Sequence, residues 1–176
     1  SPNKLDDNER LEDVITDGVI RLEGNAAENE FLDYGFNFEG IYGDNFVLQF
    51  DFTPYSKLWG TAVQFHTDDK LTGDTYIFRL VVDEDKSDWQ LERHTQAGRD
   101  YSLQEGEITP HIIDETHTLQ LIAYNDQYGV LLNDVLLASF DGVQFSAEDV
   151  GIGAHSGERL LVDLDNIKSW NLDGID

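Results

Sequence analysis

Residues 45–53 read Asn-Phe-Val-Leu-Gln-Phe-Asp-Phe-Thr. Four large apolar residues fall at every second position of this stretch: Phe46, Leu48, Phe50 and Phe52. Because successive side chains of a β-strand point to opposite faces of the sheet, these four side chains share one face. The stretch therefore predicts a strand with one face in a core and the other face polar.

The same alternation, with short apolar runs between turn residues, recurs along most of the chain. It predicts further strands at 61–66, 76–83, 89–94, 116–124, 128–133, 135–140, 150–154 and 160–172. The pair Asn133-Asp134 tolerates positive φ and predicts a tight hairpin. A parity change between Leu164 and Ile167 indicates a β-bulge. No helical apolar stripe and no repeat is found, so we expect an all-β chain of two stacked antiparallel sheets or a barrel.

Charge narrows the classes of partner. The chain has 11 basic and 36 acidic residues, for a formal net charge of −25. This field repels phosphate backbones and anionic lipid surfaces, so we expect neither nucleic acid nor membrane insertion. It attracts cations, and oxygen-rich side chains of this kind can bind Ca²⁺; the alternative is that the carboxylates are a solvated surface. There is no cysteine, so no disulfide indicates a compartment.

The first segment differs from the rest. Residues 1–17 are polar and acidic without sustained periodicity, and we interpret them as a tail or linker. Residues 18–173 then form a single domain. Because the chain starts at Ser1 and contains no methionine, we expect a processed protein or a domain excised from a larger one.

A polar ladder follows from the strand parity. If Phe50, Phe65, Phe78 and Leu91 face the core, the opposite parity places polar side chains on an outer face. These are Gln49, Asp51, Gln64, His66, Arg79, Gln90, Glu92 and His94. Planar donors and acceptors of this kind suit sugar hydroxyls, and an aromatic ring from Trp59, Tyr101 or Tyr124 could cover a sugar face. The alternative is a sheet face that is polar only because it is solvated.

A family resemblance appears in the order of segments in the second half. The segments are Tyr76–Leu80, Trp89–Arg93, His117–Ala123, Val130–Asp134, Val150–Ala154 and Val162–Trp170. Their order resembles the concanavalin A-like, laminin-G-like jelly rolls of bacterial extracellular, sugar-processing proteins, over roughly Val19 to Leu172. The resemblance implies a two-sheet jelly-roll sandwich whose N-terminal and C-terminal strands pair. It also implies a secreted or cell-surface location and a concave face that binds glycans in many relatives.

The resemblance also bears on catalysis and metal binding. Gln64-Phe65-His66 is similar to the Gln-x-His motif of jelly-roll alginate lyases, but the partner motifs of that family are missing. Asp165 falls where laminarinase-like relatives hold a structural Ca²⁺, which implies ligands from Asp163, Asp165, Glu23 and Gly24. The alternative for the two aspartates is backbone hydrogen bonding at the bulge.

Together these observations predict a non-catalytic carbohydrate-binding module with a structural calcium site. Two alternatives stay open. One is a structural or adhesive domain of a surface layer, sheath or filament, with self-assembly or neighbouring domains. The other is a glycoside hydrolase or lyase that uses Glu92 and His94 as acid and base beside Arg79 and His66.

Overall fold

The computed structural model describes residues 15–16, 18–25, 32–37, 43–55, 61–83, 85–145, 149–156 and 159–174. Thirteen strands account for most of this part of the chain. They are β1 (Ile15–Thr16), β2 (Val19–Asn25), β3 (Leu32–Asn37), β4 (Phe46–Pro54), β5 (Thr61–Asp68), β6 (Thr75–Val82), β7 (Ser87–His94), β8 (Asp100–Ile108), β9 (His117–Tyr124), β10 (Gln127–Leu132), β11 (Val135–Asp141), β12 (Val150–Ser156) and β13 (Arg159–Asn171).

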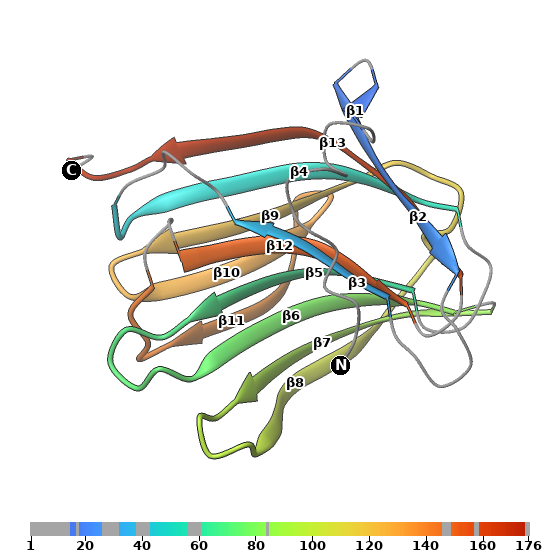
Figure 1. The fold of residues 1–176 in the computed structure, drawn as a ribbon. Helices are drawn as coiled ribbons and strands as arrows, with labels where there is room; N and C mark the ends of the chain where they lie inside the picture. The colour runs from blue at the N-terminus through green and yellow to red at the C-terminus, as the bar shows by residue number, and fades with distance from the viewer. Residues whose placement is uncertain are drawn as a thin grey trace.

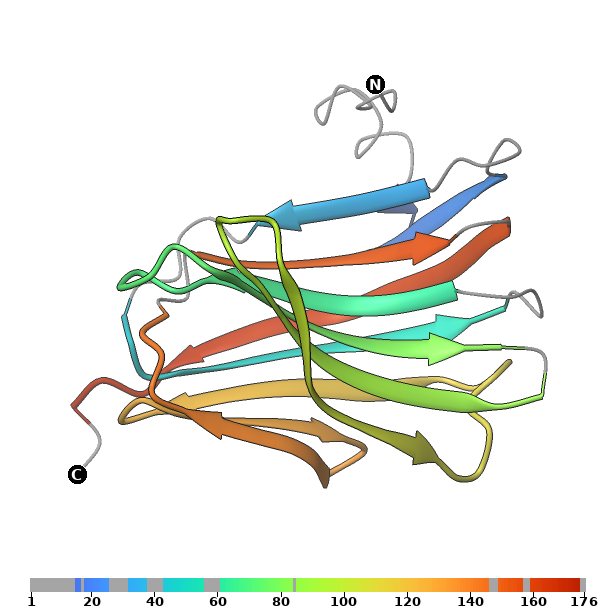
Figure 2. The same cartoon turned by 90° about the horizontal axis from the view of Figure 1, so that it is seen from below.

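The strands form two antiparallel sheets that pack face to face (Figure 1). One sheet has seven strands in the order β1-β2-β13-β4-β9-β10-β11. The other has six strands in the order β3-β12-β5-β6-β7-β8, of which β3, β12 and β5 follow one another in Figure 2. The predicted all-β sandwich is confirmed. No helix in the described ranges is long and apolar enough to span a bilayer.

The chain ends meet in the seven-stranded sheet. β2 pairs antiparallel with β13, with Leu22 opposite Val162, as the resemblance implied. Ile15 and Thr16, which fall in the expected tail, form β1 and pair with the start of β2. The rest of that tail lies outside the described residues.

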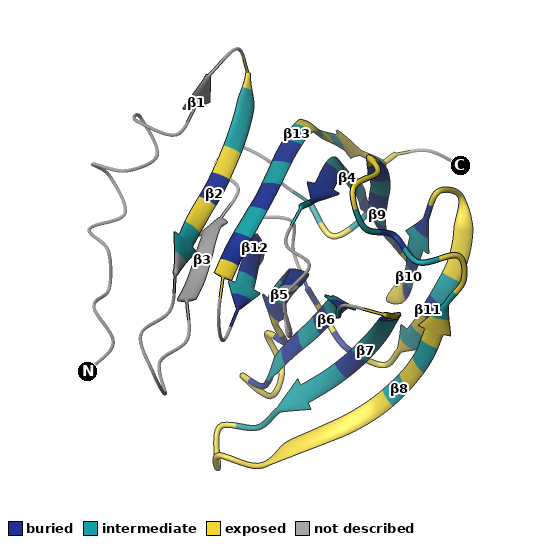
Figure 3. Cartoon of the chain, turned by 90° about the vertical axis from the view of Figure 1, so that its right-hand side faces the viewer, coloured by how far each residue is buried: buried dark blue, intermediate teal, exposed yellow. Residues whose placement is uncertain are grey.

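Strand parity places the core as predicted. Buried and half-buried positions alternate along β4 and β6, and Figure 3 shows the same banding along β13. Phe50 is fully buried and packs edge-on against Phe52 and Phe65, at ring-centroid distances of 6.3 and 5.2 Å. Aromatic pairs in this geometry add to the free energy gained from burying apolar area.

Two predicted irregularities are confirmed. Asn133 and Asp134 have φ values of 49° and 66° and close the β10–β11 hairpin. The β13–β4 register shifts between Asp165 and Lys168, where Asn166 has a φ of 50°. This bulge reverses the parity of β13, so that Ile167 packs against the core whereas Lys168 and Trp170 are exposed.

Four strands lie outside the predicted ranges, namely β1, β2, β3 and β8. β8 is the edge of the six-stranded sheet, and most of its residues are exposed (Figure 3). An edge strand with both faces partly in solvent does not show the apolar alternation that identifies the inner strands.

Candidate functional site

The outer face of the six-stranded sheet brings together six of the side chains predicted from parity. Gln64 and His66 lie on β5, Arg79 on β6, and Gln90, Glu92 and His94 on β7. Gln64, Arg79 and Gln90 are direct Cα partners across three adjacent strands, which places them in one row. This register places these residues on one surface of the sheet.

Three of these side chains are linked by direct contacts. Arg79 Nη2 lies 3.0 Å from Glu92 Oε2, and His94 Nε2 lies 2.9 Å from the same oxygen. His94 Nδ1 lies 2.9 Å from Asp100 Oδ1 on β8. We call Arg79, Glu92, His94 and Asp100 the polar relay. A neutral imidazole can donate to only one of the two carboxylates, whereas a protonated imidazole donates to both.

The relay is partly open to solvent. The side chains of Arg79 and Glu92 are each 22% exposed, and that of Asp100 is 69% exposed. Gln64, by contrast, is only 8% exposed. The part of this face that a ligand can reach therefore lies mainly over β6, β7 and β8, with half-buried His66 at its border on β5.

Arg79 carries an unused donor. Its Nε is buried and has no hydrogen-bond partner in the part of the chain that the structure describes. A buried donor without an acceptor costs about 1–3 kcal/mol. Arg79 therefore gains free energy from any rearrangement that supplies an acceptor to this atom.

Three of the predicted site residues lie elsewhere. Gln49 and Asp51 are on β4 and Tyr124 ends β9, so all three belong to the seven-stranded sheet. The expectation that they line the same face as Arg79 is wrong, because parity assigns a face within a strand but does not say which sheet the strand joins. Gln49 accepts a hydrogen bond from Gln120, and Asp51 accepts from Thr118 and Asn166.

The predicted aromatic platform is not found beside the relay in the described part of the chain. Trp59 lies outside the described residues. Tyr101 pairs with Arg93 on β7 and so has the opposite parity to Glu92. The relay therefore offers planar polar groups, and the described residues add no ring beside them.

The predicted calcium ligands are occupied by other contacts. Both carboxylate oxygens of Asp163 accept hydrogen bonds of 2.7 Å from the Arg21 guanidinium, and this contact raises the pKa of Arg21. Asp165 accepts from the backbone of Asn166, and Glu23 lies 3.8 Å from Arg159. Gly24 pairs with Leu160 within the sheet.

Calcium coordination requires six to eight oxygen ligands around one point. A guanidinium cation already neutralises Asp163, and the described residues contain no cluster of three acidic or histidine side chains that could hold a metal ion. The ligand set predicted from the sequence therefore does not fit Ca²⁺ in this arrangement. The calcium site stays a prediction without a geometric basis.

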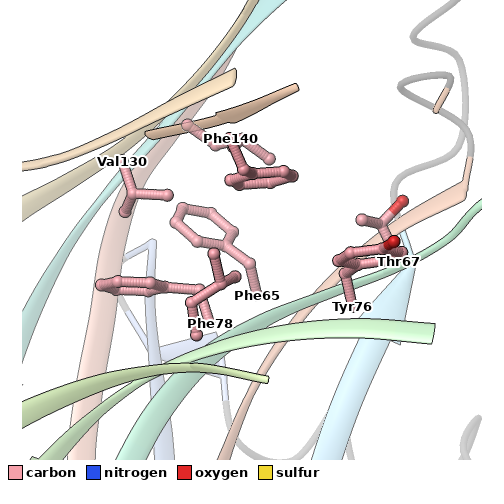
Figure 4. A pocket seen from close by; sticks show the side chains of 8 residues that line it. Phe65, Thr67, Tyr76, Phe78, Val130 and Phe140 are labelled. Carbon is pink, nitrogen blue, oxygen red and sulfur yellow. The ribbon is translucent and has the colours of Figure 1, made fainter. Parts of the chain in front are cut away.

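The recess between the two sheets is apolar (Figure 4). It is lined by Phe65, Thr67, Tyr76, Phe78, Leu91, Leu121, Val130 and Phe140. Phe65, Phe78 and Phe140 crowd together there, and nearly all the walls are apolar (Figure 4). A ligand rich in hydroxyl groups would lose its hydrogen bonds in such a space, so this recess is not a sugar site.

A buried serine–histidine contact is structural. Ser87 Oγ lies 2.6 Å from His111 Nδ1 and accepts a hydrogen bond from Ile112 N. Ser87 is fully buried, so a substrate cannot reach its hydroxyl group. The contact fixes the segment between β8 and β9 and does not form a nucleophile.

Comparison with known proteins identifies the fold. No family model and no curated protein sequence matches the chain. Among solved structures, carbohydrate-binding module CBM66 from Bacillus subtilis is similar, with a TM-score of 0.57 and 16% identity over 86% of this chain and 94% of that one. A Bacteroides ovatus mixed-linkage glucan GH16 protein, solved with a G4G4G3G product, has a TM-score of 0.57 and 10% identity over 84% of each chain.

Sheep galectin-11 is also similar, with a TM-score of 0.53 and 12% identity over 79% of this chain and 96% of that one. These identities are too low to carry more than the fold. The chain therefore has the concanavalin A-like jelly-roll architecture that its sequence resembles.

Proposed function

We propose that this protein is a carbohydrate-binding module that holds a glycan on the outer face of its six-stranded sheet. The observation that carries the proposal is the polar relay, in which Arg79 and Glu92 are fixed against each other at 3.0 Å on adjacent strands. Arg, Glu and Gln side chains offer the planar donors and acceptors that sugar hydroxyls need.

The charge of the relay favours a neutral glycan. Arg79 offsets the charge of Glu92, Asp100 adds one negative charge, and the whole chain carries −25. A polyanionic saccharide would be repelled by that field. The similarity in fold to a carbohydrate-binding module and to a galectin supports this class of ligand without specifying the sugar.

Calorimetric titration with neutral hexasaccharides of glucose, galactose, mannose and fructose tests the proposal. We expect wild-type protein to bind at least one of them and Arg79→Ala to lose about tenfold or more in affinity, which corresponds to about 1.4 kcal/mol or more. Arg159→Ala is the matched control, because Arg159 is an exposed arginine at the start of β13 on the other sheet. Equal affinities for wild type and Arg79→Ala would contradict the proposed site.

A further inference from the structure

The outer face of the seven-stranded sheet has a second feature that the relay does not explain. Trp170 on β13, Val47 on β4 and Ile122 on β9 lie in one row, as direct Cα partners across adjacent strands. Leu131 and Leu136 continue the apolar surface on β10 and β11, where they are partners in the next row. We call these five residues the apolar strip.

The strip faces away from the core. None of its members belongs to the buried core cluster or to the apolar residues packed against it. Trp170 is 45% exposed and Leu136 is 58% exposed, at the two ends of the strip. With strands about 4.8 Å apart, the strip runs roughly 15–20 Å across the sheet, which is the length of a short oligosaccharide.

A glycine shapes one end of the strip. Gly129 on β10 pairs with Ile122, so a side chain at this position would rise from the same row. A Cβ atom added there would lie 3.3 Å from Leu136 Cδ1. The Leu136 side chain therefore occupies the space above Gly129 and extends the apolar surface beside Ile122.

Polar amides border the strip. Gln49 and Gln120 lie beside the row of Trp170, in the row that also holds Lys168 and Leu131. Gln120 Nε2 donates to Gln49 Oε1 at 2.9 Å. This bond fixes both amide planes yet uses only one of the donors of Gln120. Tyr124, which is 39% exposed, is two residues along β9 from Ile122 and points to the same face.

We infer that this face is a second carbohydrate-binding surface, with Trp170 as its stacking platform and the Gln49–Gln120 pair as its hydrogen-bonding border. Aromatic rings cover the apolar face of a sugar, and planar amides bind its hydroxyl groups. A second copy of this chain would bring another 25 negative charges to the surface, which disfavours self-association there.

The inference goes beyond the proposed function, because a module with a site on each sheet can cross-link polysaccharide chains. Binding at two faces also raises the apparent affinity for a polymer through effective concentration. A hexasaccharide, in contrast, binds to one face at a time, so its titration measures the affinity of each face separately.

The test is calorimetric stoichiometry with the same neutral hexasaccharides, on wild type, Trp170→Ala, Trp170→Tyr and Arg79→Ala. We expect two sites per chain in wild type and one in either alanine variant. Trp170→Tyr should keep the second site within a few-fold of the wild-type affinity, because it keeps an aromatic ring. Tyr101→Ala is the matched control, because Tyr101 is 46% exposed but lies on the other sheet.

The outcomes separate the two sites. One site in wild type that Arg79→Ala removes and Trp170→Ala leaves intact would overturn the second surface and keep the proposed function. One site that only Trp170→Ala removes would overturn the relay site instead. A lack of binding to every hexasaccharide by a folded wild-type protein would overturn both. Unchanged melting temperatures check that each variant is folded.

Discussion

The guanidinium of Arg79 lies 3.0 Å from the carboxylate of Glu92 although the two residues are not Cα partners. Arg79 faces Gln90 across the β6–β7 ladder, and Glu92 faces Ile77. The contact is therefore diagonal, and it is possible because both side chains are long and have the same parity. This geometry holds a donor and an acceptor side by side on a face that solvent reaches.

Glu92 distinguishes binding from catalysis. A glycosidase needs an acid and a base or nucleophile at the glycosidic bond, and Glu92 is the carboxylate at the centre of the relay. We expect no release of reducing ends from neutral polysaccharides by wild type, and only a few-fold loss of affinity in Glu92→Gln, which keeps the shape and an acceptor. Product release by wild type that disappears in Glu92→Gln would instead establish a hydrolase.

Most of the fold could be predicted because period-two alternation is a direct consequence of strand geometry. The alternation in β4 predicts one buried face, and its four apolar residues are all buried: Phe46, Leu48, Phe50 and Phe52. The site could be predicted only in part. Parity put Gln49 and Arg79 on outer faces, but the pairing of β4 with β9 and β13, which assigns Gln49 to the other sheet, depends on long-range contacts that no local pattern encodes.

The apolar strip could not be predicted for a related reason. Val47, Ile122 and Trp170 are separated by long stretches of sequence and become neighbours only through the ladder. In the sequence, each is an isolated apolar residue among the outward-facing positions of its strand, which are otherwise mostly polar. The bulge at Asn166, by contrast, could be predicted because the apolar alternation changes parity locally, between Leu164 and Ile167.

Buried His117 makes stability depend on pH. His117 Nε2 donates to Ile112 O at 3.1 Å and Nδ1 accepts from Asn133 Nδ2 at 2.9 Å, as a neutral ring requires. Burial lowers the pKa of His117 below its usual 6.5, because desolvation disfavours the charged form. Below about pH 6.5 the imidazole of His117 is therefore protonated in the unfolded chain but stays neutral in the folded chain. The free energy of unfolding has its full value above about pH 6.5 and decreases as the pH drops below it.

We expect His117→Gln to make this decline shallower, since a glutamine amide can donate and accept but does not titrate. Urea unfolding at about pH 7, 6 and 5 measures the slope of the unfolding free energy against pH. The other histidines contribute equally to the pH dependence of wild type and of His117→Gln, so the difference between the two slopes is due to His117. Identical slopes would show that this ring does not control the decline.

The Tyr128 hydroxyl group fixes the segment after β11. It donates to Val143 O at 3.3 Å and accepts from Phe145 N at 3.1 Å, in a buried position. Tyr128→Phe leaves both backbone groups without this partner, so we expect a loss of about 1–3 kcal/mol in unfolding free energy. Exposed Tyr101→Phe is the control and should cost less than about 0.5 kcal/mol.

The Arg21–Asp163 ion pair tests the calcium prediction. Because the guanidinium engages both oxygens of Asp163, we expect neither Ca²⁺ nor a chelator to move the melting temperature of wild type. Scanning calorimetry with Ca²⁺, with a chelator and with neither measures the melting temperature under each condition. A clear rise in melting temperature with Ca²⁺ that Asp165→Asn removes would restore the calcium site.

A glycan bound as proposed contacts the polar relay, and the side-chain signals of the relay report that contact most directly. In a ¹⁵N-resolved NMR titration with the hexasaccharide that binds most tightly, we expect the Arg79 Nε–H and His94 ring resonances to shift in a saturable, dose-dependent way. Arg159 on the opposite sheet should stay unchanged. Saturable binding with the Arg79 and His94 signals unmoved would contradict glycan binding at the polar relay.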